Sequence, residues 1–379
     1  MRFARFVGVL LAWGSSLLAA SAYARDAVGF SRGYGPRSRV LYARPTVEWQ
    51  VWAQEGSHIT SYRMRVNGAV VPARYDEQTK TMRYTPPAPL SPGSYDVKCD
   101  VEVDGILRMD RHWSFDVHSD AVPELQQPSE AQLALMAEVN RYRRDLGLPD
   151  FKIDARLASA GAGHVKYLVL NNRNGHQELI GDRGFFGQIP QERLEAYDFL
   201  GDSWECVAYG DDSMHDAVRS VFDAPYHRIP FMQPGELIAG GDFGGKRVAL
   251  EFEMVHTRQT VVSPADGQTG IPCSWRNSEH PSPLVGREVY GAVGYPIMLC
   301  HFNPNDKPIK EVTATLTMNG ESIPCYLNTP ETDSNLKFAL ILIPEKPLSP
   351  MTKYTVDVQA KNDLGQQVRR RWSFTTGPS

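Results

Sequence analysis

Three short polar segments near the middle of the chain contain residue types that bind metals or transfer protons. They read Gly-His-Gln-Glu at 175–178, Trp-Glu-Cys at 204–206 and Ala-Pro-Tyr-His-Arg at 224–228, each surrounded by apolar sequence. Imidazoles and carboxylates from separate segments can act together only if the fold makes them converge. The sequence therefore predicts one composite site.

Five residues are the candidates for this site. His176, Glu205 and His227 are the expected metal ligands, with Glu178 and His164 as further candidates. Two imidazoles and two carboxylates suit Zn²⁺ or another divalent metal ion, with neutral imidazole as the ligand. Without a metal, the same cluster could hold water for general-base chemistry, and Glu205 would then be the candidate catalytic residue.

Each candidate also has a structural interpretation. His176 could bond a backbone carbonyl from a loop, and His227 could interact with the dipole at a helix end. Glu205 could be a surface carboxylate, although its apolar neighbours favour burial, where a carboxylate needs a cationic or metal partner. His164 could be a hydrogen-bonded core histidine, and Glu178 could be a solvated charge.

Helical patterns connect these polar segments. Ser129 with Gln132 forms a capping box at the start of one predicted helix. Asp154 is a good N-cap for a second helix, and a third begins at Ser213 and ends at Pro225. Strands at 237–241 and 247–255 follow, joined through Gly244-Gly245. Helices packed on this small antiparallel sheet predict a three-layer arrangement.

An internal repeat brackets the central region. Asn67-Gly68 and Asn319-Gly320 are predicted hairpin turns, and apolar residues alternate along 95–104, as in a half-buried strand. Short strands with such turns predict a β-sandwich in each copy. The matched pairs, in the same order in both copies, are 66–72 with 318–324, 89–92 with 347–350, 94–97 with 353–356, and 111–115 with 370–374.

The central motifs resemble the bacterial branch of the CAP superfamily (cysteine-rich secretory proteins, antigen 5 and pathogenesis-related proteins). This resemblance implies a cleft lined by His and Glu that binds a small apolar ligand or a protein partner. Cys206 stands where the family usually has Asn. The matching residues are Asn140, Arg143, Gly147-Leu148, Ala162, His164, Tyr167, His176, Gly184, Gly187, Pro190, Arg193, Glu205, His227-Arg228 and Gly240-Gly241.

The expected fold class is α+β multidomain, with a central three-layer α/β/α CAP sandwich flanked by two all-β sandwiches. The flanking regions resemble bacterial immunoglobulin-like domains in architecture. Linkers are expected at 119–128 and 263–269, where turn residues gather. The predicted organisation is a signal peptide at 1–24, an immunoglobulin-like domain at 27–118, a CAP domain at 125–257 and a second immunoglobulin-like domain at 258–377.

The first residues resemble an export signal. Arg2 and Arg5 precede an apolar stretch at 7–18, and Ala22-Tyr23-Ala24 fits the small-x-small cleavage pattern. A membrane anchor is the alternative, but the apolar stretch is shorter than the roughly 20 residues that span a bilayer. We therefore expect a secreted or periplasmic protein without a transmembrane span after cleavage.

Charge and cysteine content bear on two further properties, nucleic-acid binding and disulfide formation. The formal net charge is −4 for 379 residues, and no basic patch with interleaved aromatics is present, so nucleic-acid binding is not expected. Cys273, Cys300 and Cys325 share one region, where at most one local disulfide can form. Which pair would form it stays open.

Three functions remain. The favoured one is a non-enzymatic protein of the cell envelope or exterior that binds an apolar ligand or an envelope protein. A metal-assisted hydrolase acting on peptide or cell-wall substrates is an alternative, less favoured because no Ser or Cys nucleophile with a neighbouring base is evident. The third is a structural or adhesive envelope protein, and fold resemblance alone cannot choose among them.

Overall fold

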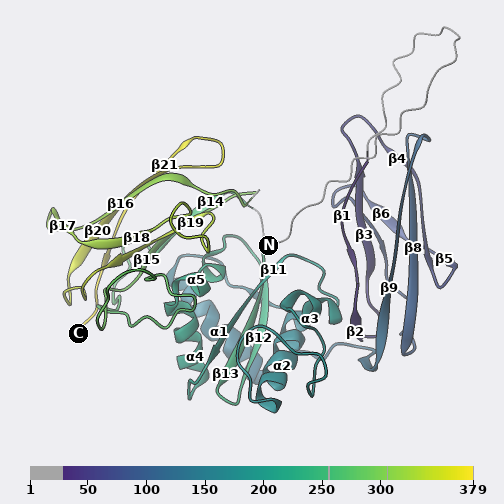
Figure 1. Ribbon diagram of the computed structural model, residues 1–379, viewed down its shortest axis with the longest axis horizontal. Helices are drawn as coiled ribbons and strands as arrows, with labels where there is room; N and C mark the ends of the chain where they lie inside the picture. Colours follow the sequence, from purple (N-terminus) through teal and green to yellow (C-terminus); the bar gives the residue numbers. More distant parts are fainter. Residues whose placement is uncertain (1–28, 255–256, 305, 379) are drawn as a thin grey trace, which may run out of the picture.

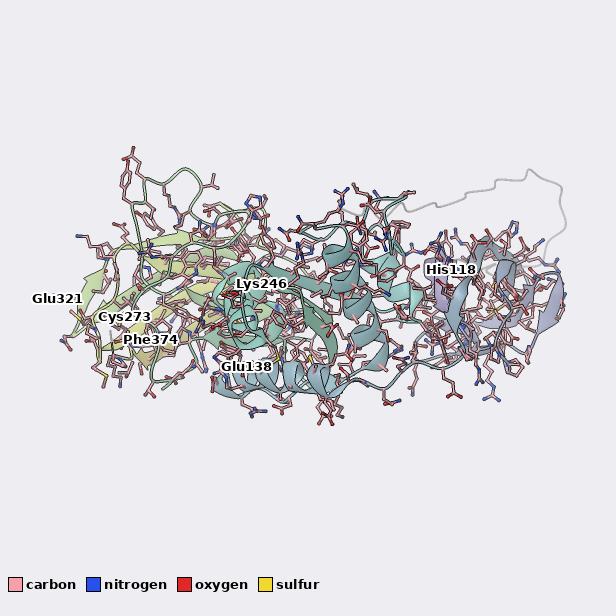
Figure 2. All side chains as sticks on the ribbon, turned by 90° about the horizontal axis from the view of Figure 1, so that it is seen from below. His118, Glu138, Lys246, Cys273, Glu321 and Phe374 are labelled. Carbon is pink, nitrogen blue, oxygen red and sulfur yellow. The ribbon has the colours of Figure 1, made fainter. Side chains whose placement is uncertain are left out.

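Two all-β bodies flank a central body in which the helices gather (Figure 1). Viewed at 90° to this, Figure 2 shows the three in a row, with His118 at one end, Glu138 in the centre and Phe374 toward the other end. The predicted multidomain α+β arrangement is confirmed. The computed structural model describes residues 29–254, 257–304 and 306–378, so the predicted signal peptide lies outside the described residues.

The N-terminal sandwich consists of two sheets with strand orders β1-β3-β7-β6 and β2-β9-β8-β4-β5. Its core lies between them, around Trp49, Met64 and Phe115, and forms a hydrophobic cluster of its own. The strands are β1 (Gly29–Gly35), β2 (Arg39–Tyr42), β3 (Val47–Ala53), β4 (Ile59–Val66), β5 (Ala69–Val71), β6 (Arg74–Asp76), β7 (Thr81–Tyr84), β8 (Gly93–Val103) and β9 (Leu107–Val122).

The C-terminal sandwich has sheets ordered β14-β15-β19-β18 and β17-β16-β20-β21. These orders repeat those of the N-terminal sandwich strand for strand, apart from the additional β2. The sequence repeat therefore encodes the same topology twice. The strands are β14 (Gln259–Ser263), β15 (Ile297–Phe302), β16 (Lys310–Met318), β17 (Glu321–Ile323), β18 (Cys325–Asn328), β19 (Ala339–Pro344), β20 (Lys353–Lys361) and β21 (Gln367–Thr375).

Equivalent contacts support the repeat at the level of side chains. The Trp113 indole donates to the carbonyl of Pro36, and the Trp372 indole donates to that of Pro264, at 2.9 and 3.0 Å. Asn67 and Asn319 both have positive φ and are followed by glycines of positive φ. Both predicted hairpin turns are thus confirmed, because a type I′ turn requires this conformation at its two central residues.

The central body is a sheet of order β10-β12-β13-β11 with helices on both faces. The predicted N-caps Ser129, Asp154 and Ser213 all accept hydrogen bonds from the first turn of their helices. Its elements are α1 (Glu130–Asp145), β10 (Lys152–Ile153), α2 (Ala155–Leu170), α3 (Pro190–Ala196), β11 (Ser203–Tyr209), α4 (Met214–Asp223), α5 (Pro225–Arg228), the 3₁₀ helix η1 (Pro230–Met232), β12 (Ile238–Gly244) and β13 (Arg247–Glu253).

Two local predictions in this body need correction. The β12–β13 turn lies at Gly245-Lys246, both of positive φ, and not at Gly244-Gly245, because Gly244 still pairs with Arg247. Helix α3, which starts on Pro190 and has no side-chain N-cap hydrogen bond, was not predicted. Seven residues without a cap give little periodic signal.

Side-chain alternation along the sheet separates its two faces. Cys206, Leu250 and Phe252 pack in the cluster that contains α1 and α4, whereas Val207 and Ala249 pack against α2. Glu205 and Val207 are two residues apart on β11, so their side chains point to the same face of the sheet. The Glu205 carboxylate therefore lies on the α2 side. The strand register thus decides which helix layer meets the site.

The two sandwiches join the central body differently. The hydrophobic cluster of the central body continues without a break into the C-terminal sandwich, for example from Met232 and Phe231 to Val261 and Cys300. The expected linker at 263–269 is not a free linker, because its backbone pairs with β21 through Gly267 N–H and the Ser373 carbonyl. The expected linker at 119–128 is shorter than predicted, since β9 extends to Val122.

Two further findings concern the cysteines and the length of the apolar helices. All five cysteines are free thiols, so Cys273, Cys300 and Cys325 form no local disulfide in this structure. No helix among the described residues is long and apolar enough to cross a membrane.

Candidate functional site

The fold brings His176, Glu205 and His227 together from three elements: the loop after α2, strand β11 and helix α5. His176 Nδ1 lies 2.7 Å from Glu205 Oε1. The imidazole rings of His176 and His227 are nearly parallel, with an interplanar angle of 15° and centroids 6.4 Å apart. The segments singled out in the sequence therefore form one local cluster.

Glu205 is the buried centre of this cluster. Its side chain is 1% exposed, and one oxygen pairs with the guanidinium of Arg193 on α3. In the β11–β13 ladder, Glu205 stands directly opposite Glu251, so two carboxyl groups meet on one face. Like charges at such positions repel, and burial increases the cost.

Protonation of one of the two carboxyl groups removes this repulsion. Burial, the neighbouring charge of Glu205 and a hydrogen bond to it raise the pKa of Glu251 well above its ordinary value. Burial alone would raise the pKa of Glu205 as well, but Arg193 and the hydrogen bond with His176 lower it to about 2. Glu251 is thus the neutral acid that donates to the Glu205 carboxylate. Its oxygens otherwise have no donor among the described residues.

His227 is held by a carboxylate from outside the central body. Glu279 lies in the long 264–296 connection between β14 and β15, and its Oε1 is 2.6 Å from His227 Nδ1. Its other oxygen accepts the backbone N–H of Tyr226 at 2.7 Å. The C-terminal sandwich therefore contributes a residue to the site.

Cys206 occupies the position where a resemblance to the CAP family would predict Asn. Its thiol donates to the backbone carbonyl of His227 at 3.5 Å. Burial, followed by the charges of Glu279 and Glu205, raises the pKa of this thiol well above its ordinary value, so it stays protonated. Cys206 thus links β11 to α5, and the neighbouring carboxylates oppose its ionisation.

His164 and Glu178 form a second, fully buried pair beside the first. His164 Nδ1 lies 3.0 Å from Glu178 Oε1, and His164 Nε2 lies 3.0 Å from the Gly175 carbonyl. The second Glu178 oxygen accepts the Phe186 N–H. Both imidazole nitrogens and both carboxylate oxygens have protein partners, which supports the core-histidine interpretation of His164.

Among the described residues, the imidazole nitrogens of this site without a protein partner are Nε2 of His176 and Nε2 of His227. With Nδ1–H donating to a carboxylate, a neutral imidazole has its lone pair on Nε2. Neither His176 nor His227 has a hydrogen bond at Nε2 within the described part of the chain. Their side chains are 46% and 19% exposed, respectively. Carboxylate support at one nitrogen and a free second nitrogen is the usual environment of a metal-ligating histidine.

A fuller metal cage is absent from the described residues, where no group of three or more His, Cys, Asp or Glu side chains is arranged to hold an ion. The oxygens of Glu205 are already bonded to His176, Arg193 and Glu251. The residues therefore fit a metal site with two imidazole ligands, in which Glu205 orients the imidazole of His176 and does not bind the ion itself.

Sequence reasoning missed two acidic members of the site. Glu251 could have been found, because it is a carboxylate on the α2 side of a predicted, mostly apolar strand. Glu279 could not, since it lies in an irregular segment far from the motifs. Arg193 belongs to the family-like loop pattern of the sequence, but that pattern does not indicate its pairing with Glu205.

Comparisons with known proteins agree with this geometry. The model of the CAP family, "Cysteine-rich secretory protein family", matches residues 136–235, and this region of the chain is a CAP domain. It lies within the predicted 125–257. His176, Glu205, His227 and Arg193 fall inside the match, whereas Glu251 and Glu279 lie beyond it. No curated protein matches the chain.

Solved structures give weaker similarity. An extracellular SCP-domain protein of Bacillus anthracis is 13% identical, with 56% of this chain and 78% of that chain covered and a TM-score of 0.29. The copper resistance protein PcoC of Escherichia coli is 17% identical, with 30% and 94% covered and a TM-score of 0.20. Superpositions at these scores carry no argument about function.

Proposed function

We propose that this chain is an exported binding protein whose CAP domain holds a divalent transition-metal ion, with Zn²⁺ as the first candidate, between His176 and His227. The observation that carries the proposal is the pair of nearly parallel imidazoles, each bonded through Nδ1 to a buried carboxylate and open at Nε2. A bound ion would supply a Lewis-acidic point for an oxygen atom of a ligand.

The surrounding residues have supporting roles in this proposal. Glu205 and Glu279 fix the orientation and tautomer of the two imidazoles, and Arg193 with the Glu251 proton keeps Glu205 in place. Two protein ligands leave other coordination positions to water or ligand, so the affinity for the ion should be modest. The export signal expected at 1–24 supports a location in the periplasm or outside the cell.

Hydrolysis is the less supported function. A general base must be accessible and have a pKa near the working pH. Glu205 is buried, has three partners and has a pKa lowered to about 2. Incubation with mixed peptides and cell-wall fragments, with and without Zn²⁺, should therefore give no turnover. Turnover that Glu205→Gln abolishes but Cys206→Ser retains would favour the hydrolase.

The apolar ligand expected from the family resemblance has less support than a polar one. The contacts around the histidine pair are carboxylates, a guanidinium and a thiol. We therefore propose a ligand with an anionic or hydroxyl oxygen at the ion, while any apolar portion would lie elsewhere.

Equilibrium dialysis of the full mature chain against Zn²⁺ tests the site. About one ion per chain should bind, and His176→Ala or His227→Ala should abolish binding. Glu279→Gln should weaken binding about tenfold or more, as losses of supporting carboxylates usually do. His215→Ala is the matched control, because His215 Nδ1 also lies 2.9 Å from a carboxylate, that of Glu138, but outside the site. Unchanged binding in both site variants would reject the proposal.

A further inference from the structure

Exposed apolar side chains gather at the C-terminal end of α2 and in the loop after it. Residues 169–180 contain four of the thirteen large hydrophobic side chains that are exposed in the described part of the chain, and no other stretch of that length contains more than two. Single exposed apolar residues are normal on a protein surface, whereas a group of them indicates an interaction site. The four are Val169 (43% exposed), Leu170 (41%), Leu179 (44%) and Ile180 (79%).

Contacts between α2 and the following loop hold these side chains close together. The Tyr167 hydroxyl on α2 accepts the backbone N–H of Leu179 at 2.9 Å, which fixes the loop beside the helix. A Cβ atom added at Gly184 would lie 3.4 Å from Leu170 Cδ1, so the far end of the loop also packs on the end of α2. The helix end and the loop therefore present their exposed side chains on one surface.

Ile180 lies at the tip of a tight turn in this loop. The Leu179 carbonyl accepts the Asp182 N–H at 3.1 Å, and Gly181 has a φ of 92°. A positive φ at the third residue is typical of a type II turn and favours glycine there. Ile180 is then the second residue of the turn, and it is the most exposed of the four apolar residues. Its side chain can enter an apolar layer without a change in the fold.

The turn between β12 and β13 completes this surface. A Cβ atom added at Gly245 would lie 2.6 Å from Val169 Cγ2, so the turn packs on the end of α2. The Arg247 guanidinium, just after the turn, donates to the Arg173 carbonyl and to the Asn172 side chain. Arg247 is thereby held beside the apolar residues.

Basic residues surround the apolar side chains. Lys166, Arg183 and Arg247 have no ionic partner within the described residues, whereas Arg173 pairs with Asp182. We call these three basic residues and the four apolar ones the α2-end patch. In segments 166–184, 211–212 and 245–247, the basic side chains are Lys166, Arg173, Arg183, Lys246 and Arg247, and the acidic ones apart from the buried Glu178 are Asp182, Asp211 and Asp212.

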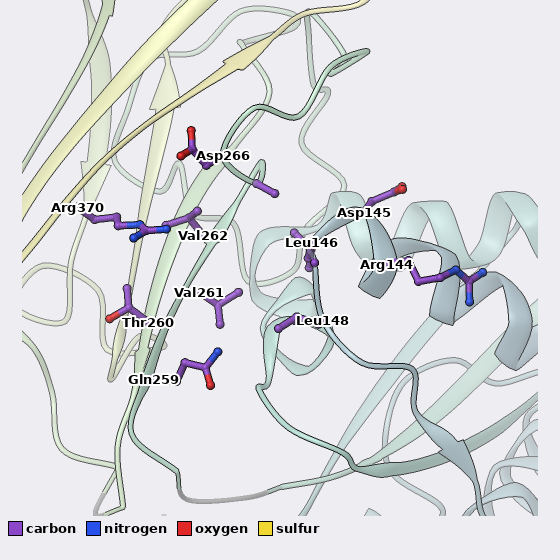
Figure 3. Close-up of a pocket in the computed structure, with 12 residues that line it drawn as sticks. Arg144, Asp145, Leu146, Leu148, Gln259, Thr260, Val261, Val262, Asp266 and Arg370 are labelled. Carbon is purple, nitrogen blue, oxygen red and sulfur yellow. The ribbon is translucent and has the colours of Figure 1, made fainter.

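These segments thus have an excess of two positive charges, in a chain whose formal net charge is −4. A cavity elsewhere on the molecule lacks such an excess. It lies between the end of α1 and β14, with a volume of about 390 Å³ (Figure 3). Its charged lining residues are Arg144, Asp145, Asp266 and Arg370, whose charges balance. The cavity therefore provides a control position for the basic residues of the α2-end patch.

We propose that the α2-end patch docks the protein on a bilayer surface of anionic phospholipid. Ile180 and the other apolar side chains would enter the boundary between headgroups and acyl chains, and Lys166, Arg183 and Arg247 would meet the phosphate groups. A bilayer is the favoured partner because it accepts a protruding turn and a helix end without a complementary groove. Few apolar side chains and few basic ones take part, so binding should be weak and reversible.

Co-sedimentation of the full mature chain with phospholipid vesicles tests the charge selection. Wild type should bind vesicles of phosphatidylglycerol and phosphatidylcholine in equal parts, and should bind pure phosphatidylcholine about tenfold or more weakly, since each basic residue near an anionic surface strengthens binding about fivefold. Arg183→Glu should weaken binding to the mixed vesicles about tenfold, because it replaces an attraction by a repulsion. Arg370→Glu, which makes the same charge change at the balanced cavity, should bind like wild type.

A second pair of variants tests the apolar contact. Ile180→Asp should weaken binding to the mixed vesicles about tenfold or more, because an apolar side chain that enters the bilayer is replaced by a charged one. Ile106→Asp is the matched control, since Ile106 is 74% exposed in the turn between β8 and β9 of the N-terminal sandwich. It should bind like wild type. Circular dichroism of all variants should match that of wild type.

Several outcomes would overturn the proposal. They are absence of binding by wild type, equal binding to both kinds of vesicle, and equal loss in Ile180→Asp and Ile106→Asp. With a chelator present, His227→Ala should bind vesicles like wild type, because His227 is not part of the α2-end patch. Loss of vesicle binding in this variant would also contradict docking by the patch, whereas its loss of Zn²⁺ binding concerns only the proposed metal site.

Discussion

At the scale of single residues, the site depends on one proton shared between two opposing carboxyl groups. Glu205 and Glu251 occupy paired positions of β11 and β13, yet their pKa values shift in opposite directions. The Arg193 guanidinium favours the charge on Glu205, while burial beside that charge keeps Glu251 neutral. Each residue therefore has a different tolerance for substitution.

Replacing Glu251 by Gln should not destabilise the protein at neutral pH, because Gln is also uncharged, can donate to Glu205 and has no carboxyl proton to retain. Glu205→Gln should cost about 3–5 kcal/mol, since it removes the nearer counter-charge of the buried Arg193 and leaves only Glu178, 3.9 Å from Arg193 Nε. Urea denaturation of both variants at neutral pH measures these free energies of unfolding. A larger loss for Glu251→Gln than for Glu205→Gln would contradict the assignment of the proton.

The raised pKa of Glu251 also predicts how stability depends on pH. Above the ordinary value of 4.5, the unfolded chain releases this proton while the folded chain keeps it. The folded state then binds more protons, so this group makes the free energy of unfolding fall as pH rises. Glu251→Gln removes this contribution. The stability of the variant relative to wild type should therefore increase as the pH rises above 4.5, as measured by urea titrations. A constant difference would argue against a proton on Glu251.

At the scale of elements, two short helices connect the site to its surroundings. On α3, Arg193 pairs with Glu205, while Glu195 on the same helix pairs with Arg37 of the N-terminal sandwich. Asp198, just after α3, accepts two hydrogen bonds from Thr46 of that sandwich. On the other side, α5 presents His227 to Glu279. The elements that hold the site are thus themselves held by both sandwiches.

Helix α2 packs closely on β12. A Cβ atom added at Gly240 would lie 2.3 Å from the backbone nitrogen of Ala158, which cannot move independently of α2. Gly240→Ala should therefore destabilise the protein by about 1–3 kcal/mol or more, the usual cost of overpacking. Gly33→Ala is the control, since an added Cβ there meets nothing within 4 Å. Thermal denaturation followed by circular dichroism compares the two, and an equal effect would contradict close packing of α2.

At the scale of the molecule, the shared core makes the central body and the C-terminal sandwich one unit. Limited digestion with a protease that cleaves after Glu should cut at the exposed Glu124 between β9 and α1, and release a folded N-terminal sandwich. The 258–268 segment should resist, because Arg258 pairs with Asp363 and β14 is part of a sheet. Mass spectrometry of the fragments distinguishes the outcomes. A stable fragment ending near 257 would show that the CAP domain does not need the C-terminal sandwich.

Local sequence signals determined much of this protein. The capping residues Ser129, Asp154 and Ser213 depend on hydrogen bonds within a few residues, and the Asn-Gly turns depend on backbone conformation at two positions. The sequence repeat that includes Trp113 and Trp372 indicated the same topology for the two sandwiches, because both copies carry the same order of strands and turns. Local chemistry of this kind is visible in a sequence.

Tertiary structure decided what depends on contacts between distant segments. The pairing of Glu205 with Glu251 follows from the strand register, and the partnership of Glu279 with His227 from the path of a long irregular connection. The joining of two hydrophobic cores could not be predicted either, since the apolar residues of each domain already fit a core of its own. Sequence named the histidines of the site, but only the folded chain determined which carboxylates orient them and which nitrogens remain open.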